Sequence, residues 1–364
     1  MSAFGIEEEY LLVDRATLLP AAPTSEQLRA LTAIPPTGGQ ITTEWLACQV
    51  EYASAVLRTA EEGFDALIGF REALAAAADR LGLSAAALGT APQLAEVPAA
   101  ISDGERYREM TALAPAIAAE QLINGMHVHV GVPDQETGVR ALNGIRRWLP
   151  VLTALSANSP VWRGVDSGFA SWRSIHYRRW VVNGTPPHFV DAADYDSHIA
   201  ALLRTDVIGE EAMVGWLARL SPRHGTVEIR ACDVQLSADD ALTLALLIRS
   251  LVEVEIEDPV AEAIPTALLD VAHWQAARFG TAGTLMDAGV QRSVPAAAAV
   301  WAAVERAQPT LAAHGDDERV RAGVRRLLHA GTGAHRQRDA LARGGVSGLL
   351  AFAGEQMTSR ESCA

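Results

Sequence analysis

Two histidines in the stretch 124–131 give the first sign of chemistry in this sequence. His127 and His129 alternate there with three apolar residues, which is the pattern of a β-strand with one polar and one apolar face. Imidazoles on an otherwise apolar strand are unfavourable unless something binds them. The stretch therefore predicts a strand that presents a ligand-binding face.

Three other segments repeat this alternation of polar and apolar residues. Glu7 and Glu9 share one face of a segment near the N-terminus, and Glu228 and Arg230 share one face of a later segment. A segment around Glu51 fits the pattern more weakly. Folded into one sheet, the four segments would form a common polar groove lined by Glu7, Glu9, Glu51, His127, His129, Glu228 and Arg230.

The residue types of this groove favour a metal site. Each segment alone has a structural explanation, because a histidine can be satisfied in a core, a glutamate can lie on a solvated edge, and a Glu–Arg pair can bridge two strands. Four segments with the same alternation favour a common ligand instead. Glutamates without a nearby thiolate favour Mg²⁺ or Mn²⁺ over zinc. Together with arginine, such ions favour phosphoryl transfer from a bound nucleotide.

Composition excludes several other classes of function. The formal charge of −14 argues against nucleic acid or an anionic membrane as a partner. The sequence contains no lysine, which excludes Schiff-base chemistry and a P-loop lysine. Its three cysteines form no CxxC pair, and no apolar run approaches the roughly 20 residues that span a bilayer. We therefore expect a soluble, cytoplasmic protein with free thiols.

The elements expected before residue 235 include all of the strands. We expect strands at 4–14 and 85–89, and the sequence 157–190 is typical of a long functional loop that carries Arg163, Arg173, Arg178 and Arg179. The helices expected in this part cover residues 25–31, 60–81 (opened by a capping box at Thr59), 105–122 (interrupted near Pro115), 136–156 and 194–204.

From Ser237 onward the sequence predicts almost only helix. Strands before helices favour an antiparallel α+β fold over a βαβ repeat. We find no linker or internal repeat, and we predict a single catalytic domain over residues 1–364, strand-rich at 1–235 and helix-rich at 236–364. The helices expected in the second part cover residues 238–256, 265–279, 296–314, 316–330, 334–343 and 346–357.

Several motifs in this order resemble glutamate–cysteine ligase family 2, and in particular its short, YbdK-type carboxylate–amine ligases. The resemblance covers residues 4 to 350, and the motifs that carry it are Gly5-Ile6-Glu7-Glu8-Glu9, Gln49-Val50-Glu51, Glu105-Arg106-Tyr107, Gly125 to Gly131, Gly164-x-Asp166-x-Gly168 with Ala170-Ser171-x-Arg173, His224 to Arg230, and Ala277-Arg278-Phe279-Gly280. It implies a glutamine-synthetase-like catalytic fold, in which an antiparallel sheet forms an active-site funnel with helices packed behind it. It also implies ATP, two or more Mg²⁺ ions and an amide bond formed through an acyl phosphate.

The resemblance assigns roles to individual residues. The positions that match metal ligands are Glu7, Glu9, Glu51, His127 and Glu228. We expect Glu228 and Arg230 to be catalytic, and we expect substrate or nucleotide contacts from His129, Arg173, Arg219 and Arg230. Two positions depart from the family pattern, because Leu217 replaces an acid and Val181 replaces a proline. Both positions are expected near the acceptor amine, so the resemblance does not identify which amine is used.

Three functions follow from these residues. The first is an ATP-dependent carboxylate–amine ligase that joins a carboxylate, with glutamate expected, to an amine such as cysteine. The second is a metal-dependent hydrolase in which His127, His129 and Glu228 activate water. The third is a relative that binds metal or nucleotide without catalysis. The resemblance also implies a homo-oligomer, and we expect a dimer.

Overall fold

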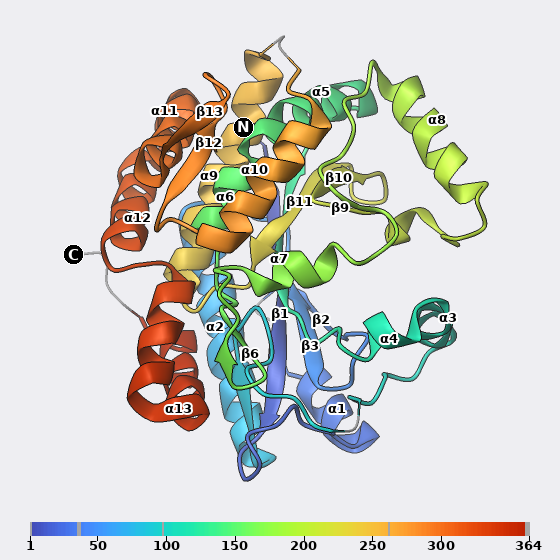
Figure 1. Ribbon diagram of the computed structural model, residues 1–364, viewed down its shortest axis with the longest axis vertical. Coiled ribbons are helices and arrows are strands. Elements are labelled where there is room, and N and C mark those ends of the chain that lie inside the picture. Colours follow the sequence, from blue (N-terminus) through green and yellow to red (C-terminus); the bar gives the residue numbers. More distant parts are fainter. Residues whose placement is uncertain (1, 35–37, 97, 261–262, 361–364) are drawn as a thin grey trace.

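A seven-stranded antiparallel sheet forms the centre of the computed structural model, which describes residues 2–34, 38–96, 98–260 and 263–360 (Figure 1). The strand order is β10-β11-β5-β1-β3-β2, and β4 pairs with the later part of β1. This confirms the antiparallel arrangement expected from the sequence. The strands are β1 Phe4–Asp14, β2 Gln40–Thr43, β3 Gln49–Ala53, β4 Leu83–Ala86, β5 Gly125–Gly131, β10 Ala218–Ser221 and β11 Thr226–Asp233.

Helices cover the apolar face of this sheet. Ile6, Val128 and Ile229 project from three neighbouring strands into one buried cluster, which also contains most of the helix Ala238–Glu257. The α-helices are α1 Ser25–Thr32, α2 Ala60–Arg80, α3 Glu105–Leu113, α4 Pro115–Ala118, α5 Gln135–Ile145, α6 Leu149–Leu155, α7 Trp172–Tyr177, α8 Ala192–Leu203, α9 Ala238–Glu257, α10 Thr266–Phe279, α11 Ala296–His314, α12 Asp317–His329 and α13 Gly333–Met357.

Local sequence signals account for several helix boundaries. Thr59 and Glu62 form the expected capping box at the start of α2, with both reciprocal hydrogen bonds at 3.2 Å. Pro115 separates α3 from α4 because its nitrogen cannot donate a hydrogen bond. Pro150 has the same effect in the helix expected at 136–156, which divides into α5, a 3₁₀ turn at Arg146–Trp148 and α6.

The structure corrects five expectations about the elements. The strand expected at 85–89 is β4, and the helix expected at 105–122 ends at Ala118. The loop 157–190 contains helix α7 and short strands, and the helix-rich part contains a β-hairpin. The break expected between 343 and 346 is a kink in α13 at Gly345. These smaller strands are β6 Val161–Trp162 with β7 Val165–Asp166, β8 Asn183–Gly184 with β9 Gly215–Trp216, and β12 Thr284–Asp287 with β13 Arg292–Pro295.

A fully buried charged network ties the back of β1 to the helical layer. Arg71 on α2 donates to both carboxylate oxygens of Glu8, at 3.0 and 2.5 Å, and Tyr10 donates to the same carboxylate. Arg71 also donates to the carbonyls of Gln235 and Leu236, which follow β11 (3.0 and 3.1 Å). The network fixes which face of β1 is turned inward, so the alternate residues of this strand face the opposite side.

Among the described residues, no helix is long and apolar enough to cross a bilayer. The large buried cluster joins the central strands to α9, α11 and α12, which belong to the helix-rich part. A single domain over the whole chain stays a prediction.

Candidate active site

The open face of the sheet carries the polar groove expected from the sequence. In each of four strand pairs, the register brings two of the expected residues directly opposite each other. The pairs are Glu7 with His127 across β1 and β5, Glu9 with Glu51 across β1 and β3, Glu228 with His129 across β11 and β5, and Arg219 with Glu228 across β10 and β11.

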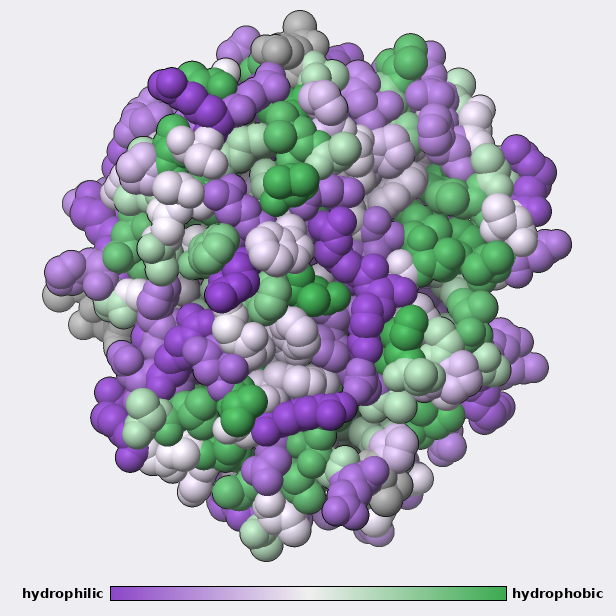
Figure 2. Space-filling model, viewed as in Figure 1, coloured by the Kyte–Doolittle hydropathy of each residue, from purple (hydrophilic) through white to green (hydrophobic). Residues whose placement is uncertain are grey.

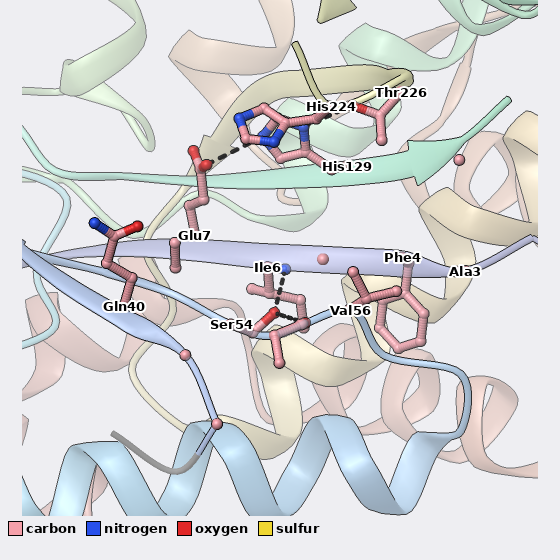
Figure 3. A pocket seen from close by; sticks show the side chains of 16 residues that line it. Ala3, Phe4, Ile6, Glu7, Gln40, Ser54, Val56, His129, His224 and Thr226 are labelled. Carbon is pink, nitrogen blue, oxygen red and sulfur yellow. Dashed lines mark hydrogen bonds and ion pairs between the residues drawn. The ribbon is translucent and has the colours of Figure 1, made fainter. Parts of the chain in front are cut away.

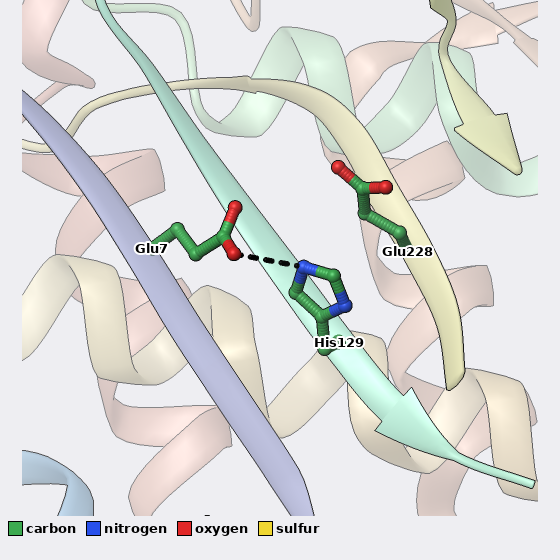
Figure 4. A group of neighbouring side chains, drawn as sticks. All are labelled: Glu7, His129 and Glu228. Carbon is green, nitrogen blue, oxygen red and sulfur yellow. Dashed lines mark ion pairs between the residues drawn. The ribbon is translucent and has the colours of Figure 1, made fainter. Parts of the chain in front are cut away.

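Glu7 lies at the centre of the groove. Its Oε2 is 3.1 Å from His127 Nδ1. Its Oε1 is 3.2 Å from His129 Nε2, and Figure 4 shows this contact with Glu228 beside it. Burial would raise the pKa of Glu7, but the two histidines hold it well below its usual value. Potential ligand atoms within 4.8 Å of one another form two groups around it: Glu7 with Glu51 and His127, and Glu7 with His129 and Glu228.

Glu228 sits between two arginines. Arg219 Nε donates to its Oε2 at 2.6 Å, and Arg230 donates to its Oε1. Burial would raise the pKa of Glu228, but Arg230 and Arg219 hold it far below the usual range, so the side chain is a carboxylate. Arg230 also donates to the Tyr177 hydroxyl at 3.1 Å and lies 3.5 Å from His127 Nδ1.

The other side of the groove is crowded with carboxylates. Burial and the neighbouring Glu9 raise the pKa of Glu44 to about 7, and burial with Glu44 and Glu7 nearby raises the pKa of Glu51 well above its usual value. Several carboxylates in one partly dry groove repel one another unless a cation lies between them. Oxygen donors with a single imidazole are the set that Mg²⁺ or Mn²⁺ accepts. The residues therefore fit divalent cations.

A small inner pocket opens beside this carboxylate group. It measures about 70 Å³. Its basic wall is Arg173, which is 3% exposed and lies over Gly125, where an added Cβ would come within 2.2 Å of the guanidinium. Any side chain at position 125 would clash with this guanidinium, so the position requires glycine. The Nε atoms of Arg173 and Arg230 have no hydrogen-bond partner among the described residues. The pocket is lined by Glu9, Glu44, Trp45, Gln49, Gln121, Ile123, His127, Arg173, Tyr177 and Arg230.

Buried hydrogen bonds hold Arg173 in place. Asp233 accepts hydrogen bonds from the hydroxyls of Ser159 and Ser171, and its Oδ1 is 3.9 Å from Arg173 NH1. Ser159 also accepts from the Arg173 backbone nitrogen at 3.0 Å. The guanidinium is therefore positioned by the protein and keeps donor capacity for an anion.

A larger outer pocket lies at the other end of the groove. It has a volume of about 430 Å³, and Glu7, His129 and Thr226 line its inner end (Figure 3). Much of the remaining wall is backbone and small side chains, from the first residues of β1 and from residues 38–40 and 53–56. Glu7 and His127 are in contact, so the central residues lie between the inner and the outer pocket.

All nine residues expected at the site lie along this groove. The ring of His129, which was expected to contact substrate or nucleotide, lies in a group of potential metal ligands, and its contact with substrate stays a prediction. The other arginines of the loop 157–190 point elsewhere: Arg163 and Arg179 pair with Glu120, and Arg178 pairs with Asp270. The sequence reasoning assigned no role to Glu44, Trp45, Gln121 or Tyr177, although Tyr177 follows Arg173 at helical i, i+4 spacing.

The two departures from the family pattern lie outside the polar groove. Leu217 is buried in the main apolar core, and the Val181 side chain is exposed. Cys48 and Cys232 also lie outside the polar groove, in apolar clusters. Burial raises the pKa of the Cys48 and Cys232 thiols to about 12, and a β-bulge after Ile229 turns Cys232 to the apolar face. Cys363 is outside the described residues.

Solved structures share this architecture at low sequence identity. The glutamate–cysteine ligase of Francisella tularensis, in complex with AMP, matches with a TM-score of 0.73 at 12% identity over 99% of this chain and 89% of that chain. A bifunctional glutathione synthetase from Pasteurella multocida matches with a TM-score of 0.71 at 14% identity, over 98% of this chain and 52% of that chain. The class is therefore a glutamine-synthetase-like catalytic fold, as the sequence predicted.

Sequence relatives identify the family. The profile of glutamate–cysteine ligase family 2 matches residues 3–361. A protein of Saccharopolyspora erythraea, provisionally named glutamate–cysteine ligase 2-1, is 39% identical over 93% of this chain and 90% of its own length. A protein of Streptomyces coelicolor, provisionally named glutamate–cysteine ligase 2, is 38% identical over 95% of this chain and 96% of its own length. The chain belongs to glutamate–cysteine ligase family 2, which makes it a ligase of this general type.

Proposed function

We propose that this protein is an ATP-dependent ligase that joins the side-chain carboxylate of glutamate to an amine through an acyl phosphate. One observation carries the proposal most directly. Arg230 contacts Glu228 in the group of potential metal ligands and also lines the inner pocket, so one guanidinium connects the two. A phosphoryl group that passes from the metal ligands to a carboxylate in the inner pocket would stay in contact with this guanidinium.

The two pockets suggest where the substrates bind. The inner pocket offers the buried, partly unsatisfied guanidinium of Arg173 and the hydroxyl of Tyr177, which suits a small carboxylate. The outer pocket has room for the nucleoside part of ATP. The phosphates would then extend along Glu7 toward Arg230.

The carboxylates of the groove would hold the divalent ions. Four of the five expected ligands, Glu7, Glu51, His127 and Glu228, lie in the two groups of potential ligand atoms. Glu9 lines the adjoining inner pocket, and the geometry adds His129 and Glu44. Bound Mg²⁺ or Mn²⁺ would neutralise the phosphate charge that develops during transfer. Arg219 and Arg230 hold the Glu228 carboxylate in one orientation, and Arg230 supplies a fixed positive charge.

The proposed reaction consists of two displacements. An oxygen of the glutamate side-chain carboxylate attacks the γ-phosphorus of ATP, and the bond to ADP breaks. The uncharged amine then attacks the carbonyl carbon, and phosphate leaves. The amine arrives as an ammonium and loses one proton before the attack and a second when the amide forms. One of these protons ends on the phosphate, and the other is released to solvent. The phosphorylation step is needed because a free carboxylate has no adequate leaving group.

Hydroxylamine gives a direct test, because this small neutral nucleophile captures an acyl phosphate as a hydroxamate. We expect hydroxamate and ADP to form in equal amounts from ATP, Mg²⁺, glutamate and hydroxylamine. Chelation of the metal should abolish both products, and added Mg²⁺ or Mn²⁺ should restore them. ADP release without hydroxamate, or full activity after exhaustive chelation, would contradict the proposal.

The other two functions expected from the sequence receive less support. The relatives and structures described above are ligases and synthetases, and none supports a hydrolase. A relative without catalysis would bind ATP but release no ADP in the same assay. The use of ATP agrees with the expected cytoplasmic location, and the expected dimer stays a prediction.

A further inference from the structure

A second cleft lies beside the groove, between α3 and the segment that follows α8. It has a volume of about 430 Å³. The two walls face each other on the same side of the molecule, and apolar and hydrophilic surface are mixed there (Figures 1 and 2). The cleft is lined by Glu105, Arg106, Glu109, Met110, Leu113, Val207, Gly209, Glu210 and Met213.

Each wall of this cleft is directly attached to the groove. On one side, Tyr107 on α3 donates its hydroxyl hydrogen to the carbonyl of Thr43 at 3.2 Å, next to Glu44. On the other side, Arg219 donates to the carbonyls of Ala212 and Val214 at 2.8 and 3.1 Å, while it also holds Glu228. The cleft therefore lies next to the groove.

The charged residues of the cleft are mostly acidic. Arg106 is its single basic residue, and its guanidinium is engaged by Glu210 at 2.6 Å. In the parts of the chain that the structure describes, neither Glu105 nor Glu109 has an ion-pair partner. A negatively charged ligand would find no free guanidinium here, whereas a cation would find two free carboxylates.

The apolar residues of the cleft lie on both walls. Leu113 on α3 is 43% exposed, and Val207 on the opposite segment is 42% exposed. Met110 and Met213 are half-buried beside them. Methionine side chains adapt to varied apolar shapes. An alkyl chain could lie between these walls with a charged end near the glutamates.

We propose that this cleft binds the part of the acceptor amine beyond its reacting nitrogen, and that it selects aliphatic amines with a second positive charge and no carboxylate. The inference rests on the function proposed above. The carboxylate donor already has the guanidinium of Arg173 in the inner pocket, so the two substrates are recognised by opposite charges. An acceptor amino acid such as cysteine would bring its carboxylate toward Glu105 and Glu109.

Matched pairs of acceptors test the charge preference. With ATP, Mg²⁺ and glutamate, 1,4-diaminobutane should give a higher kcat/KM than butylamine, which has the same chain without the second charge. Cysteinamide should likewise exceed cysteine. An exposed ion pair changes an equilibrium by up to about fivefold, so each pair should differ by several-fold. Equal values within each pair, or a preference for cysteine, would overturn the inference.

A double variant, Glu105→Gln with Glu109→Gln, locates the preference in this cleft. It should lower kcat/KM for 1,4-diaminobutane by about 10-fold, from two exposed charges. Hydroxamate formation and the KM values for ATP and glutamate should stay unchanged, because hydroxylamine does not reach the cleft walls. Glu355→Gln on α13 is the control, because it removes an exposed carboxylate elsewhere.

The hydroxylamine reaction separates the two ways of failing. Normal hydroxamate formation with an unaltered diamine preference in the double variant would overturn the cleft assignment alone. If the wild-type protein forms no hydroxamate, the proposed function fails, and the cleft assignment fails with it.

Discussion

Replacing Glu228 with glutamine is expected to lower kcat by about 10²–10³, as removal of a preorganised catalytic group typically does. Glutamine keeps the shape of the side chain but removes the charge that Arg219 and Arg230 now contact and that a metal ion would share. Arg230→Lys is also expected to lower kcat. The planar guanidinium contacts Glu228 and Tyr177 through two separate nitrogens, which a single ammonium cannot reproduce.

Glu120→Gln provides the matched control for this change. Glu120 also pairs with two arginines, Arg163 and Arg179, but it lies at the surface outside the groove. We expect near-normal kcat for this control. If Glu228 had only a structural role, Glu228→Gln would lower the melting temperature and leave turnover near normal. Measurement of kcat and melting temperature on both variants distinguishes the two roles.

Replacing Arg71 with methionine is expected to destabilise the protein by about 3–5 kcal/mol, the range typical of an uncompensated buried charge. The side chains of Arg71 and Glu8 are both 0% exposed, so the carboxylate would lose its counter-ion without gaining water. Denaturant titration measures the loss of unfolding free energy. A change below about 1 kcal/mol, the usual value of an exposed pair, would contradict the role assigned to this network.

Two further variants control for the loss of the arginine itself. Arg360→Met removes an exposed arginine that pairs with Glu72, and the melting temperature should hardly change. Adding Glu8→Gln to Arg71→Met should recover part of the lost stability, because the unpaired charge is then absent. No recovery would show that packing of Arg71, and not its charge, dominates.

The strands and their polar faces could be predicted because a strand has a period of two residues. His127 with His129, and Glu7 with Glu9, therefore had to share a face once each segment was extended. The order of the strands could not be derived from that period. The resemblance implied an antiparallel sheet, but the strand order and the registers that oppose Glu7 to His127 became visible only in the folded sheet.

Irregular backbone and tertiary packing limited the rest of the prediction. Strict alternation from Glu228 and Arg230 would put Cys232 on the polar face, but the bulge after Ile229 reverses the phase of the strand. Glu44 and Tyr177 join the site through loops and a short helix, where no periodic pattern marks the side that faces the groove. The hairpin formed by β12 and β13 lies in a region of strong helical signals, and its four-residue strands are too short to stand out.

The most direct test of the account follows oxygen atoms during turnover. Glutamate labelled with ¹⁸O in its side-chain carboxylate is incubated with the protein, ATP, Mg²⁺ and an amine, and the inorganic phosphate is analysed by mass spectrometry. If the carboxylate attacks the γ-phosphorus, each phosphate released should carry one ¹⁸O, and ADP should be the nucleotide product. Unlabelled phosphate, or AMP in place of ADP, would contradict the acyl-phosphate ligase proposed here.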